Sequence, residues 1–287
     1  MAWTNYHTHC YLCDGHGRPE DYVAEAIRQG AWGLGFSCHA PLPFETAWNM
    51  KAGDLEPYCR LVRDLGKAHI QDLPLFLGLE IDFIPEVIGP NAPLFQAANL
   101  DFTIGAVHFV GQDGDGVPWT VDGPPDQFAR GLKSGHGGDI RRVAETFYAL
   151  VRKMVETDCP DIIAHFDLVK KNNSGGKYFS EDAPWYRRAV FETLEVIAAS
   201  GTILEVNTGG IVRKRTDALY PSAWILERCL ELDIPLTLNA DAHEPQHVTS
   251  GFAGAARVLL EVGYRELYTL RADGWQPQPF TPDGLQY

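Results

Sequence analysis

Short runs of apolar and β-branched residues alternate with amphipathic segments along almost the whole chain. The amphipathic segments, in which apolar residues recur every three or four positions, predict helices at 55–70, 140–156, 186–200, 223–232 and 253–262. A first helix should begin at Pro19 and end at Gly30, because proline suits the first helical turn and glycine the position after the last. The apolar runs predict strands at 3–7, 33–37, 75–79, 102–107, 162–164, 203–206, 236–238 and 266–270.

This alternation predicts an α/β protein built on a parallel sheet. Strands that are apolar throughout are buried on both faces, which requires helices on each side of the sheet. Two segments stand outside the pattern, namely a polar loop at 111–138, rich in Gly, Asp and Pro, and a Pro-rich tail after residue 270. The sequence shows no internal repeat, low-complexity tract or shift in composition, so we expect a single domain over residues 1–287.

Residues of metal-binding type follow these strands, mostly at the point where the chain leaves a strand. An open parallel sheet binds its ligand at one switch point between two strands. Here the candidate ligands follow at least six strand-like segments, so they converge only if the sheet closes into a barrel with its site at the C-terminal strand ends. The candidates, which include most of the ten histidines, are His7, His9, His16, His39, Glu80, His108, His165, Asp241 and His243.

The types and spacing of these residues indicate a site for several cations. In the H-x-H of His7 and His9, both imidazoles point the same way, because side chains alternate along an extended chain. Glu80 and Asp241 add oxygen ligands, and a mixed nitrogen and oxygen set suits Zn, Mn or Fe. Nine ligands exceed the needs of one ion, so we expect two or three ions that share Glu80 as a bridge. Such clusters lower the pKa of a bound water and stabilise displacement at phosphorus.

The overall charge and the cysteines restrict the class of protein further. A formal charge of −14 disfavours binding to nucleic acid or an anionic membrane. The chain has no apolar stretch of membrane-spanning length and no signal-peptide pattern at its start, and its six cysteines are typical of reduced thiols. We therefore expect a cytoplasmic protein. Cys10 and Cys13 form a C-x-x-C, but this short spacing is common by accident and no second pair accompanies it.

An ordered series of motifs resembles the polymerase and histidinol phosphatase (PHP) superfamily. The series is Y-H-T-H at 6–9, D-G-H-G at 14–17, C-H-A-P-L-P-F at 38–44, G-L-E-I-D at 78–82, G-A-V-H-F at 105–109, A-H-F-D at 164–167 and N-A-D-A-H at 239–243. The resemblance implies a distorted (β/α)7 TIM-like barrel with three metals. It assigns His7, His9, Glu80 and Asp241 to one metal, Glu80, His108 and His165 to the second, and His16, His39 and His243 to the third. Glu80, Asp241 and His243 would thereby be catalytic, and Asp82 and Asp167 would orient ligands.

Within this superfamily, residues 207–214 and 220–222 are similar to the monofunctional histidinol-phosphate phosphatases. That similarity implies hydrolysis of L-histidinol phosphate, a small phosphate monoester, in histidine biosynthesis. Arg213 is the expected catalytic and phosphate-binding fork, with Lys170 and Lys171 as the next candidates. The cationic groups of histidinol suit an acidic, aromatic mouth, for which the loop at 111–138 offers Asp122 and Trp119.

Three other functions compete with this interpretation. A PHP nuclease or nucleotidase would require a basic groove, which the charge of −14 disfavours, although Trp119 or Phe109 would suit a base of a small nucleotide. An amidohydrolase-like barrel also opens with H-x-H, but it usually bridges its metals through a modified lysine, where this chain offers Glu80. A non-catalytic metal-binding protein on the same scaffold would not need the intact ligand set. The oligomeric state is not predicted.

Overall fold

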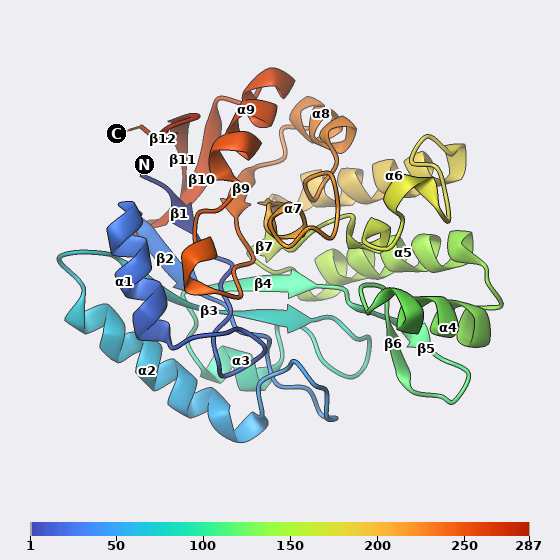
Figure 1. Ribbon diagram of the computed structural model, residues 1–287, viewed down its shortest axis with the longest axis horizontal. Coiled ribbons are helices and arrows are strands. Elements are labelled where there is room, and N and C mark those ends of the chain that lie inside the picture. The colour runs from blue at the N-terminus through green and yellow to red at the C-terminus, as the bar shows by residue number, and fades with distance from the viewer. Residues whose placement is uncertain (1, 287) are drawn as a thin grey trace.

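The computed structural model describes residues 2–286, and its core is a parallel sheet of seven strands in the order β1-β2-β3-β4-β7-β8-β9 (Figure 1). Neighbouring strands pair in parallel throughout this sheet. Met1 and Tyr287, the ends of the predicted domain, lie outside the described residues. The strands are β1 (Thr4–Asn5), β2 (Gly33–Phe36), β3 (Leu75–Asp82), β4 (Phe102–Ala106), β7 (Ile162–Ile163), β8 (Ile203–Asn207) and β9 (Leu236–Asn239).

The first and last strands meet, so the sheet forms a nearly closed barrel. Beyond β1 and β9, Thr8 and Ala242 form a parallel bridge. The backbone N–H of His9 donates to the carbonyl of Ala242 at 2.9 Å, and the N–H of Ala242 donates to the carbonyl of His7 at 3.1 Å. The predicted barrel of seven parallel strands is therefore confirmed, and it brings the two ends of the ligand series together.

Helices surround the barrel and largely follow the predicted segments (Figure 1). Pro19 is the first residue of α1, and Gly30 ends it with a φ of 70° and an N–H that donates to the carbonyls of the last turn. This is the expected left-handed end, which glycine adopts without steric cost. The helices are α1 (Pro19–Gln29), α2 (Leu55–Ala68), α3 (Pro93–Ala97), α4 (Pro125–His136), α5 (Ile140–Asp158), α6 (Pro184–Ser200), α7 (Gly209–Val212), α8 (Ala223–Glu231) and α9 (Phe252–Val262).

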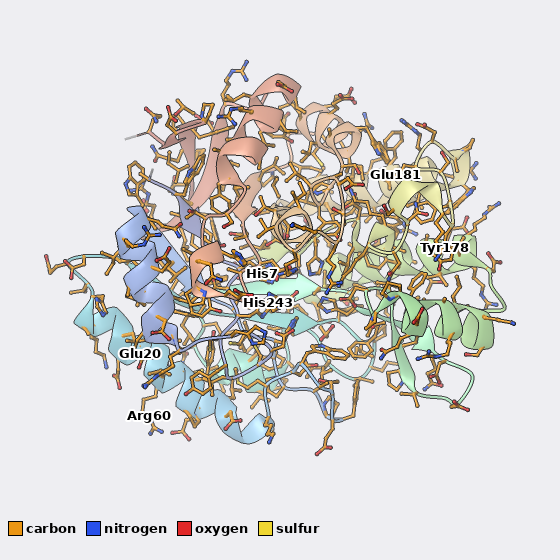
Figure 2. The ribbon with its side chains drawn as sticks, viewed as in Figure 1. His7, Glu20, Arg60, Tyr178, Glu181 and His243 are labelled. Atoms are coloured by element: carbon orange, nitrogen blue, oxygen red, sulfur yellow. The ribbon has the colours of Figure 1, made fainter. Side chains whose placement is uncertain are left out.

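The barrel interior is filled by a few large side chains. Phe102 of β4 lies across the barrel against Tyr6, with ring centroids 5.7 Å apart. Gly78 makes room for it, because a Cβ at this position would lie 2.4 Å from the Phe102 ring. Figure 2 shows the consequence for the site, since His7 and His243 lie near the centre of the barrel and Glu20 and Arg60 at its periphery.

The predicted last strand at 266–270 is present, and it forms a separate antiparallel sheet with the Pro-rich tail that follows it, for which the sequence predicted no strand. The strands β10 (Glu266–Arg271), β11 (Gly274–Thr281) and β12 (Gly284–Leu285) pair in order. This sheet packs against the ends where the barrel strands begin, and the Leu270 N–H donates to the Tyr6 hydroxyl at 2.8 Å. The Trp275 ring lies 4.9 Å from the Tyr6 ring. The floor of the barrel is thus covered, and access is left to the opposite end.

The segment 111–138 is likewise more regular than the predicted loop. It holds most of a hairpin of β5 (Phe109–Gln112) and β6 (Pro118–Thr120), followed by α4. The Gly, Asp and Pro residues mark its turns and helix ends, since Pro125 opens α4 and Gly137 closes it at a φ of 62°. No helix among residues 2–286 combines the length and the apolar composition that crossing a bilayer requires.

Candidate metal centre

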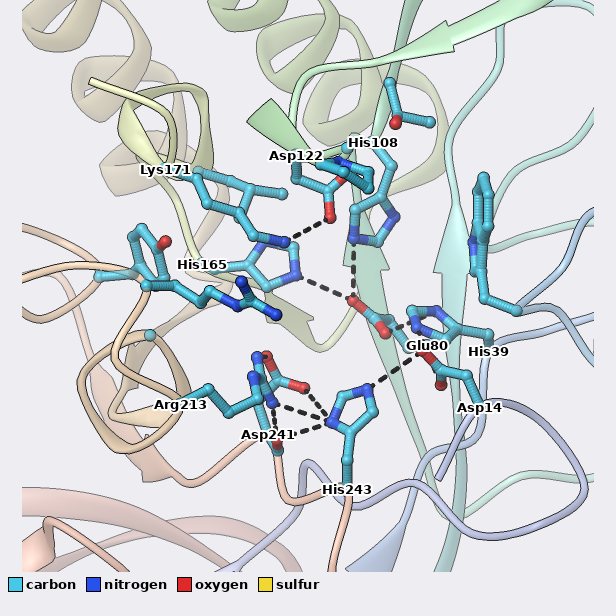
Figure 3. Close-up of a pocket in the computed structure, with 18 of the residues that line it drawn as sticks. Asp14, His39, Glu80, His108, Asp122, His165, Lys171, Arg213, Asp241 and His243 are labelled. Carbon is cyan, nitrogen blue, oxygen red and sulfur yellow. Dashed lines mark hydrogen bonds and ion pairs between the residues drawn. The ribbon is translucent and has the colours of Figure 1, made fainter. Parts of the chain in front are cut away.

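The carboxylate of Glu80 lies among histidines at the carboxyl end of the barrel (Figure 3). Its Oε1 atom lies 3.0 Å from His165 Nε2 and 3.6 Å from His108 Nε2. Its Oε2 atom lies 2.8 Å from His39 Nδ1 and 3.2 Å from His7 Nε2. The two oxygens therefore face two different sets of histidines, which is the arrangement needed for one carboxylate to serve two cations.

A second carboxylate, that of Asp241, lies beside the first histidine pair. Its Oδ1 atom is 3.3 Å from His9 Nε2, 3.8 Å from His7 Nε2 and 3.4 Å from His243 Nδ1. The side chains of the H-x-H and D-x-H motifs converge here from strand ends that pair with each other. The atoms of His7, His9 and Asp241 lie within 4.8 Å of one another and form one group suited to a metal ion.

Asp14 joins the site, although sequence reasoning had selected His16 from the same D-G-H-G motif. The Asp14 carboxylate lies 3.3 Å from His243 Nε2, 3.7 Å from His39 Nε2 and 3.9 Å from His9 Nδ1, and these four residues form a second possible metal group. His16 lines the same cavity with an exposed side chain, and its backbone N–H donates to the carbonyl of His243 at 2.6 Å. The carboxylate two residues before His16 was the available signal for Asp14.

Several buried polar atoms of the site have no hydrogen-bond partner. They are His7 Nε2, His9 Nε2, His39 Nδ1, Asp14 Oδ1 and Glu80 Oε2. Buried polar atoms without partners are rare in proteins, because each costs about 1–3 kcal/mol. Here these atoms face one another across the short distances given above. Divalent cations would satisfy them, so the residues present fit a metal centre. A third group, His39, Glu80 and His108, meets the same distance criterion.

The carboxylates control the protonation of these histidines. Burial alone would lower the pKa of His7, but the charges of Glu205, Glu80 and Asp241 raise it well above its ordinary value. In the same way, the Asp82 carboxylate outweighs burial and raises the pKa of His108 to about 9. The pocket therefore favours positive charge, carried by protons on the imidazoles or by metal ions. Because metal ions need neutral imidazole nitrogens, their binding would displace those protons.

Two further carboxylates hold the ligands in position. Glu205 accepts a hydrogen bond from His7 Nδ1 at 2.6 Å and one from the His165 N–H at 2.8 Å. Asp82 accepts from His108 Nδ1 at 2.7 Å, as expected for an orienting residue. The two bonds to Nδ1 atoms leave the Nε2 atoms of His7 and His108 directed into the site. Sequence reasoning missed Glu205, although a buried acidic residue within the apolar run of β8 was a usable signal.

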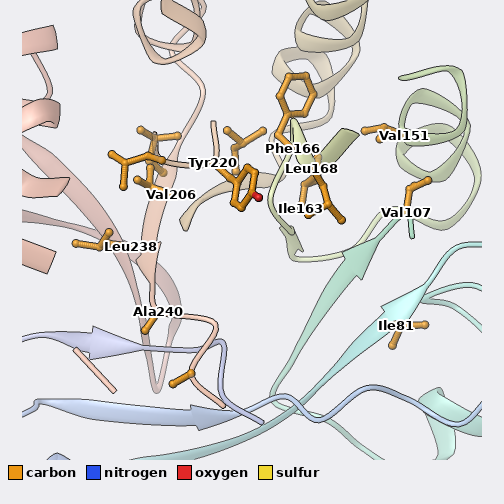
Figure 4. Close-up of a cluster of buried hydrophobic side chains, with 14 of the residues drawn as sticks. Ile81, Val107, Val151, Ile163, Phe166, Leu168, Val206, Tyr220, Leu238 and Ala240 are labelled. Atoms are coloured by element: carbon orange, nitrogen blue, oxygen red, sulfur yellow. The ribbon is translucent and has the colours of Figure 1, made fainter. Parts of the chain in front are cut away.

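Apolar residues next to the ligands in the chain help to direct the ligand side chains into the site. Ile81, Val107, Phe166 and Ala240 adjoin ligand residues and belong to the buried cluster in Figure 4. Since neighbouring residues of extended chain point to opposite sides, burial of one helps to direct the other inward. The backbone has a positive φ at two of the candidate ligands, 22° at His165 and 49° at Asp241. Left-handed backbone at non-glycine residues is uncommon and is concentrated at functional sites.

The site opens into a cavity of about 390 Å³ whose rim carries cationic side chains. Arg213, just after α7, donates from Nη2 to Asp241 Oδ2 at 2.7 Å and from Nη1 to His243 Nδ1 at 2.9 Å. On the other side, Lys171 Nζ lies 3.0 Å from Asp122 Oδ2 (Figure 3). Arg213, Lys171 and Asp122 therefore all lie where sequence reasoning expected substrate contacts.

Two other predicted substrate contacts do not reach this cavity. Lys170 is buried, and its Nζ contacts Asp167 Oδ2 at 2.7 Å and the carbonyl of Leu219 at 2.8 Å. Asp167 is thus the partner of Lys170 and does not orient a ligand. Trp119 is also buried, with its ring 5.3 Å from that of Phe128. In each case the next residue, Lys171 or Thr120, lines the cavity, because neighbouring side chains point in different directions.

Aromatic side chains from other segments line the cavity in place of Trp119. They are Trp48, whose ring stacks on Phe109 at 5.7 Å, and Tyr220, which follows the loop after α7. Sequence reasoning missed Trp48, which lies in an irregular segment with no periodicity to indicate its direction. The C-x-x-C thiols belong to the wall behind the ligands, where Cys13 Sγ lies 3.5 Å from His9 Nδ1.

A nearly closed α/β barrel with clustered histidines and carboxylates at its carboxyl end defines the class of metal-dependent barrel hydrolases. The chain belongs to the PHP domain family, whose family model matches residues 5–209.

Similar proteins extend this likeness over nearly the whole chain. A protein of Deinococcus radiodurans described as "Probable histidinol-phosphatase" is 32% identical over 275 residues, which is 94% of this chain and 97% of that protein. The histidinol-phosphatase of Bacillus subtilis is 28% identical, covering 83% of this chain and 92% of its own. A crystal structure of histidinol phosphate phosphatase from Lactococcus lactis, complexed with Zn, L-histidinol and phosphate, shares the fold. Its TM-score is 0.70 at 18% identity, with 100% of both chains covered.

Proposed function

We propose that this chain is a metal-dependent phosphomonoesterase that hydrolyses L-histidinol phosphate to L-histidinol and phosphate. The observation that carries the proposal is the position of Arg213. Its Nη2 atom lies 2.7 Å from Oδ2 of Asp241, one of the candidate metal ligands, and its side chain lies on the rim of the same cavity. The names of the two relatives at 32% and 28% identity support the same substrate. The reaction would place the enzyme in histidine biosynthesis, with residues 1–287 as one catalytic domain.

The metal centre is proposed to hold two or three divalent ions of Zn, Mn or Fe. When bound, such ions supply Lewis acidity toward phosphoryl oxygens and lower the pKa of water. Two distances support this proposal: the two oxygens of Glu80 face different histidine sets, and the Asp14 carboxylate lies beside His39 and His243, where it would add a ligand. The proposed ligands are His7, His9, Asp14, His39, Glu80, His108, His165, Asp241 and His243, with His16 at the rim.

The remaining residues bind and orient the substrate. Arg213 presents a planar guanidinium that matches two phosphate oxygens, and its hydrogen bonds to Asp241 and His243 hold that fork at the metal site. Lys171 and Asp122 carry opposite charges 3.0 Å apart, and so match the opposite charges of an aminoalkyl phosphate. Trp48 offers an aromatic face for the imidazole.

A phosphate-release panel tests this function. Protein purified without chelator and supplied with Zn or Mn is assayed on histidinol phosphate, nucleoside monophosphates, sugar phosphates and short single-stranded DNA. We expect the highest kcat/KM for histidinol phosphate. A preference for nucleotides would instead support a PHP-type nucleotidase or exonuclease, with Trp48 stacking on the base. Hydrolysis of amides and no phosphate release would support the amidohydrolase-like alternative.

Elemental analysis of the same protein should give two to three metal ions per chain, and one ion or none would contradict the multinuclear site.

A cytoplasmic location is the further part of this proposal. All six cysteines are free thiols in the structure, including Cys10 and Cys38, whose sulfur atoms lie 3.3 Å apart. Reduced thiols are typical of the cytoplasm, where disulfides are rare. Fractionation of cells that express the chain with a C-terminal epitope would test the location.

A further inference from the structure

A second cavity adjoins the metal pocket on its outer side. It has a volume of about 430 Å³ and lies between the segments 122–125, 171–177 and 214–215. Asp122, Lys171 and Arg215 line both this cavity and the metal pocket, so the two spaces share a wall. Asn172 Nδ2 donates to the carbonyl of Gly123 at 3.0 Å and ties two of the three segments together. We call this cavity the vestibule.

The vestibule is positively charged on a protein of formal charge −14. Four cationic residues line it, namely Lys171, Lys177, Lys214 and Arg215, and the only carboxylate in its lining is that of Asp122. Asp122 already lies 3.0 Å from Lys171 Nζ, which leaves three cationic charges without compensation inside the cavity.

These three cations also lack partners elsewhere. Within residues 2–286, no carboxylate oxygen lies within 4.0 Å of a side-chain nitrogen of Lys177, Lys214 or Arg215, whereas Lys171 in the same cavity is paired with Asp122. Lys177 Nζ instead lies 4.9 Å from the centroid of the Tyr178 ring. Unpaired like charges that line one cavity repel each other, so an anion there would stabilise the arrangement.

We propose that the vestibule is an outer anion site that receives the phosphate of the incoming ester and passes it to Lys171 and Arg213. This inference rests on the proposed phosphatase function. A phosphate monoester carries a charge of about −1.5 to −2 near pH 7, and a cationic cleft raises the association rate of such a ligand by ~10 to 10³-fold at low salt. The group that the vestibule would bind is a phosphate dianion. We assign an inward path to it, from the vestibule toward the metal pocket.

The position of these residues separates their role from that of the metal pocket. Lys177 and Lys214 line the vestibule and not the metal pocket, where Arg213 and Lys171 lie. Their removal should therefore slow the capture of substrate without changing the bound complex. In kinetic terms, kcat/KM should fall while kcat stays constant.

The test is the double charge reversal Lys177→Glu with Lys214→Glu. The matched control is Lys153→Glu with Arg257→Glu, two exposed positions on α5 and α9 for which no ion pair is found among the described residues. Each reversal lowers the formal charge by two units, so the charge falls from −14 to −18 in the vestibule variant and in the control alike. Zinc-loaded proteins are assayed on histidinol phosphate and on para-nitrophenyl phosphate over a range of ionic strength.

We expect the vestibule variant to lose at least ~10-fold in kcat/KM at low salt on both esters, with kcat within about twofold of the parent. Its kcat/KM should also depend less on salt than that of the parent, because screening then has less attraction to weaken. The control should stay within about twofold. Equal losses in both variants would overturn the proposal, since the effect would then belong to net charge.

Other outcomes are equally decisive. A lower kcat with weaker inhibition by inorganic phosphate would make the vestibule a route for product release and would overturn the inward assignment. If the parent hydrolyses para-nitrophenyl phosphate but not histidinol phosphate, the proposed substrate is wrong while the vestibule test still applies. If neither ester is hydrolysed, line broadening of inorganic phosphate in phosphorus NMR replaces the assay. The vestibule variant should then broaden the signal less than the control, and equal broadening would overturn the proposal.

Discussion

The inner metal pocket and the outer mouth of the barrel are built in different ways. In the pocket, most functional side chains come from the carboxyl ends of strands, and buried partners such as Glu205 and Asp82 fix them. At the mouth, Arg213, Lys171 and Asp122 come from connecting segments and are partly exposed. The pocket is therefore set by the barrel, and the mouth by the loops that the barrel carries.

This difference separates two tasks. The strand ends place ligands that must keep fixed mutual distances, and the alternation of apolar and ligand residues enforces their direction. The connecting segments place charges that must meet a substrate, and they change without altering the barrel. Substitutions in the pocket should therefore affect the metals and the chemistry together, whereas substitutions at the mouth should affect the substrate alone.

The largest effect is expected at the centre of the pocket. Glu80→Gln removes the charge that faces both histidine sets, so the protein should lose most of its metal and about 10³-fold in kcat/KM, the equivalent of about 4 kcal/mol. The matched variant is His16→Ala, whose exposed side chain lies at the rim. Metal stoichiometry by elemental analysis compares the two. Equal metal losses would show that Glu80 is not a shared ligand.

A smaller loss, confined to the substrate, is expected at the mouth. Arg213→Ala should reduce kcat/KM for histidinol phosphate by about 10²-fold, because it removes charge-assisted bonds that strengthen in the transition state. Arg213→Lys should recover only part of the loss, since an ammonium lacks the planar fork. Metal content should stay near that of the parent. Near-native activity of Arg213→Ala would place the phosphate contact elsewhere, with Lys171 as the next candidate.

Substitution of the carboxylates that hold the ligands in position should affect metal binding more than substrate binding. Glu205→Gln weakens the hydrogen bond that directs His7 Nε2 into the site, so zinc affinity should fall by about 10- to 100-fold. Competition with a chelator measures this affinity, and Glu192→Gln on the exposed face of α6 is the control. An unchanged zinc affinity with a raised KM would move Glu205 from the metal centre to substrate binding.

The sequence predicted the pocket well and the mouth poorly, for a physical reason. The apolar runs predicted as strands end just before Glu80, His108 and His165, so these polar residues were expected at the carboxyl end of the barrel, although β3 itself continues to Asp82. Asp14 and Glu205 were missed although each had a signal in the sequence, since Asp14 comes two residues before His16 and Glu205 interrupts the apolar run of β8.

At the mouth, no such periodicity was available. Trp119 lies on a short strand of a hairpin within a segment predicted to be a loop, so its alternation with Thr120 was not visible from the sequence. Lys170 and Lys171 are adjacent, and only the turn after the 3₁₀ helix Leu168–Lys170 decides which one faces the substrate. Trp48 comes from an irregular segment far from both in the chain. The directions of these side chains depend on tertiary contacts, which local sequence patterns do not encode.

The adjacent lysines provide the finest test of the difference between the two regions. Lys171→Met removes a partly exposed cation from the mouth, so KM for histidinol phosphate should rise by about tenfold, the equivalent of one charge-assisted hydrogen bond. Its free energy of unfolding should change by less than about 1 kcal/mol, because the ion pair with Asp122 is partly exposed. Lys170→Met instead leaves the fully buried Asp167 without its cation and should cost about 3–5 kcal/mol of stability. Urea unfolding of the zinc-loaded proteins measures both stabilities, and steady-state kinetics well below the unfolding transition give KM. Where Lys170→Met folds, its KM should match that of the parent. If instead Lys170→Met raises KM while Lys171→Met does not, the mouth must rearrange when substrate binds and the assignment of the two lysines is reversed.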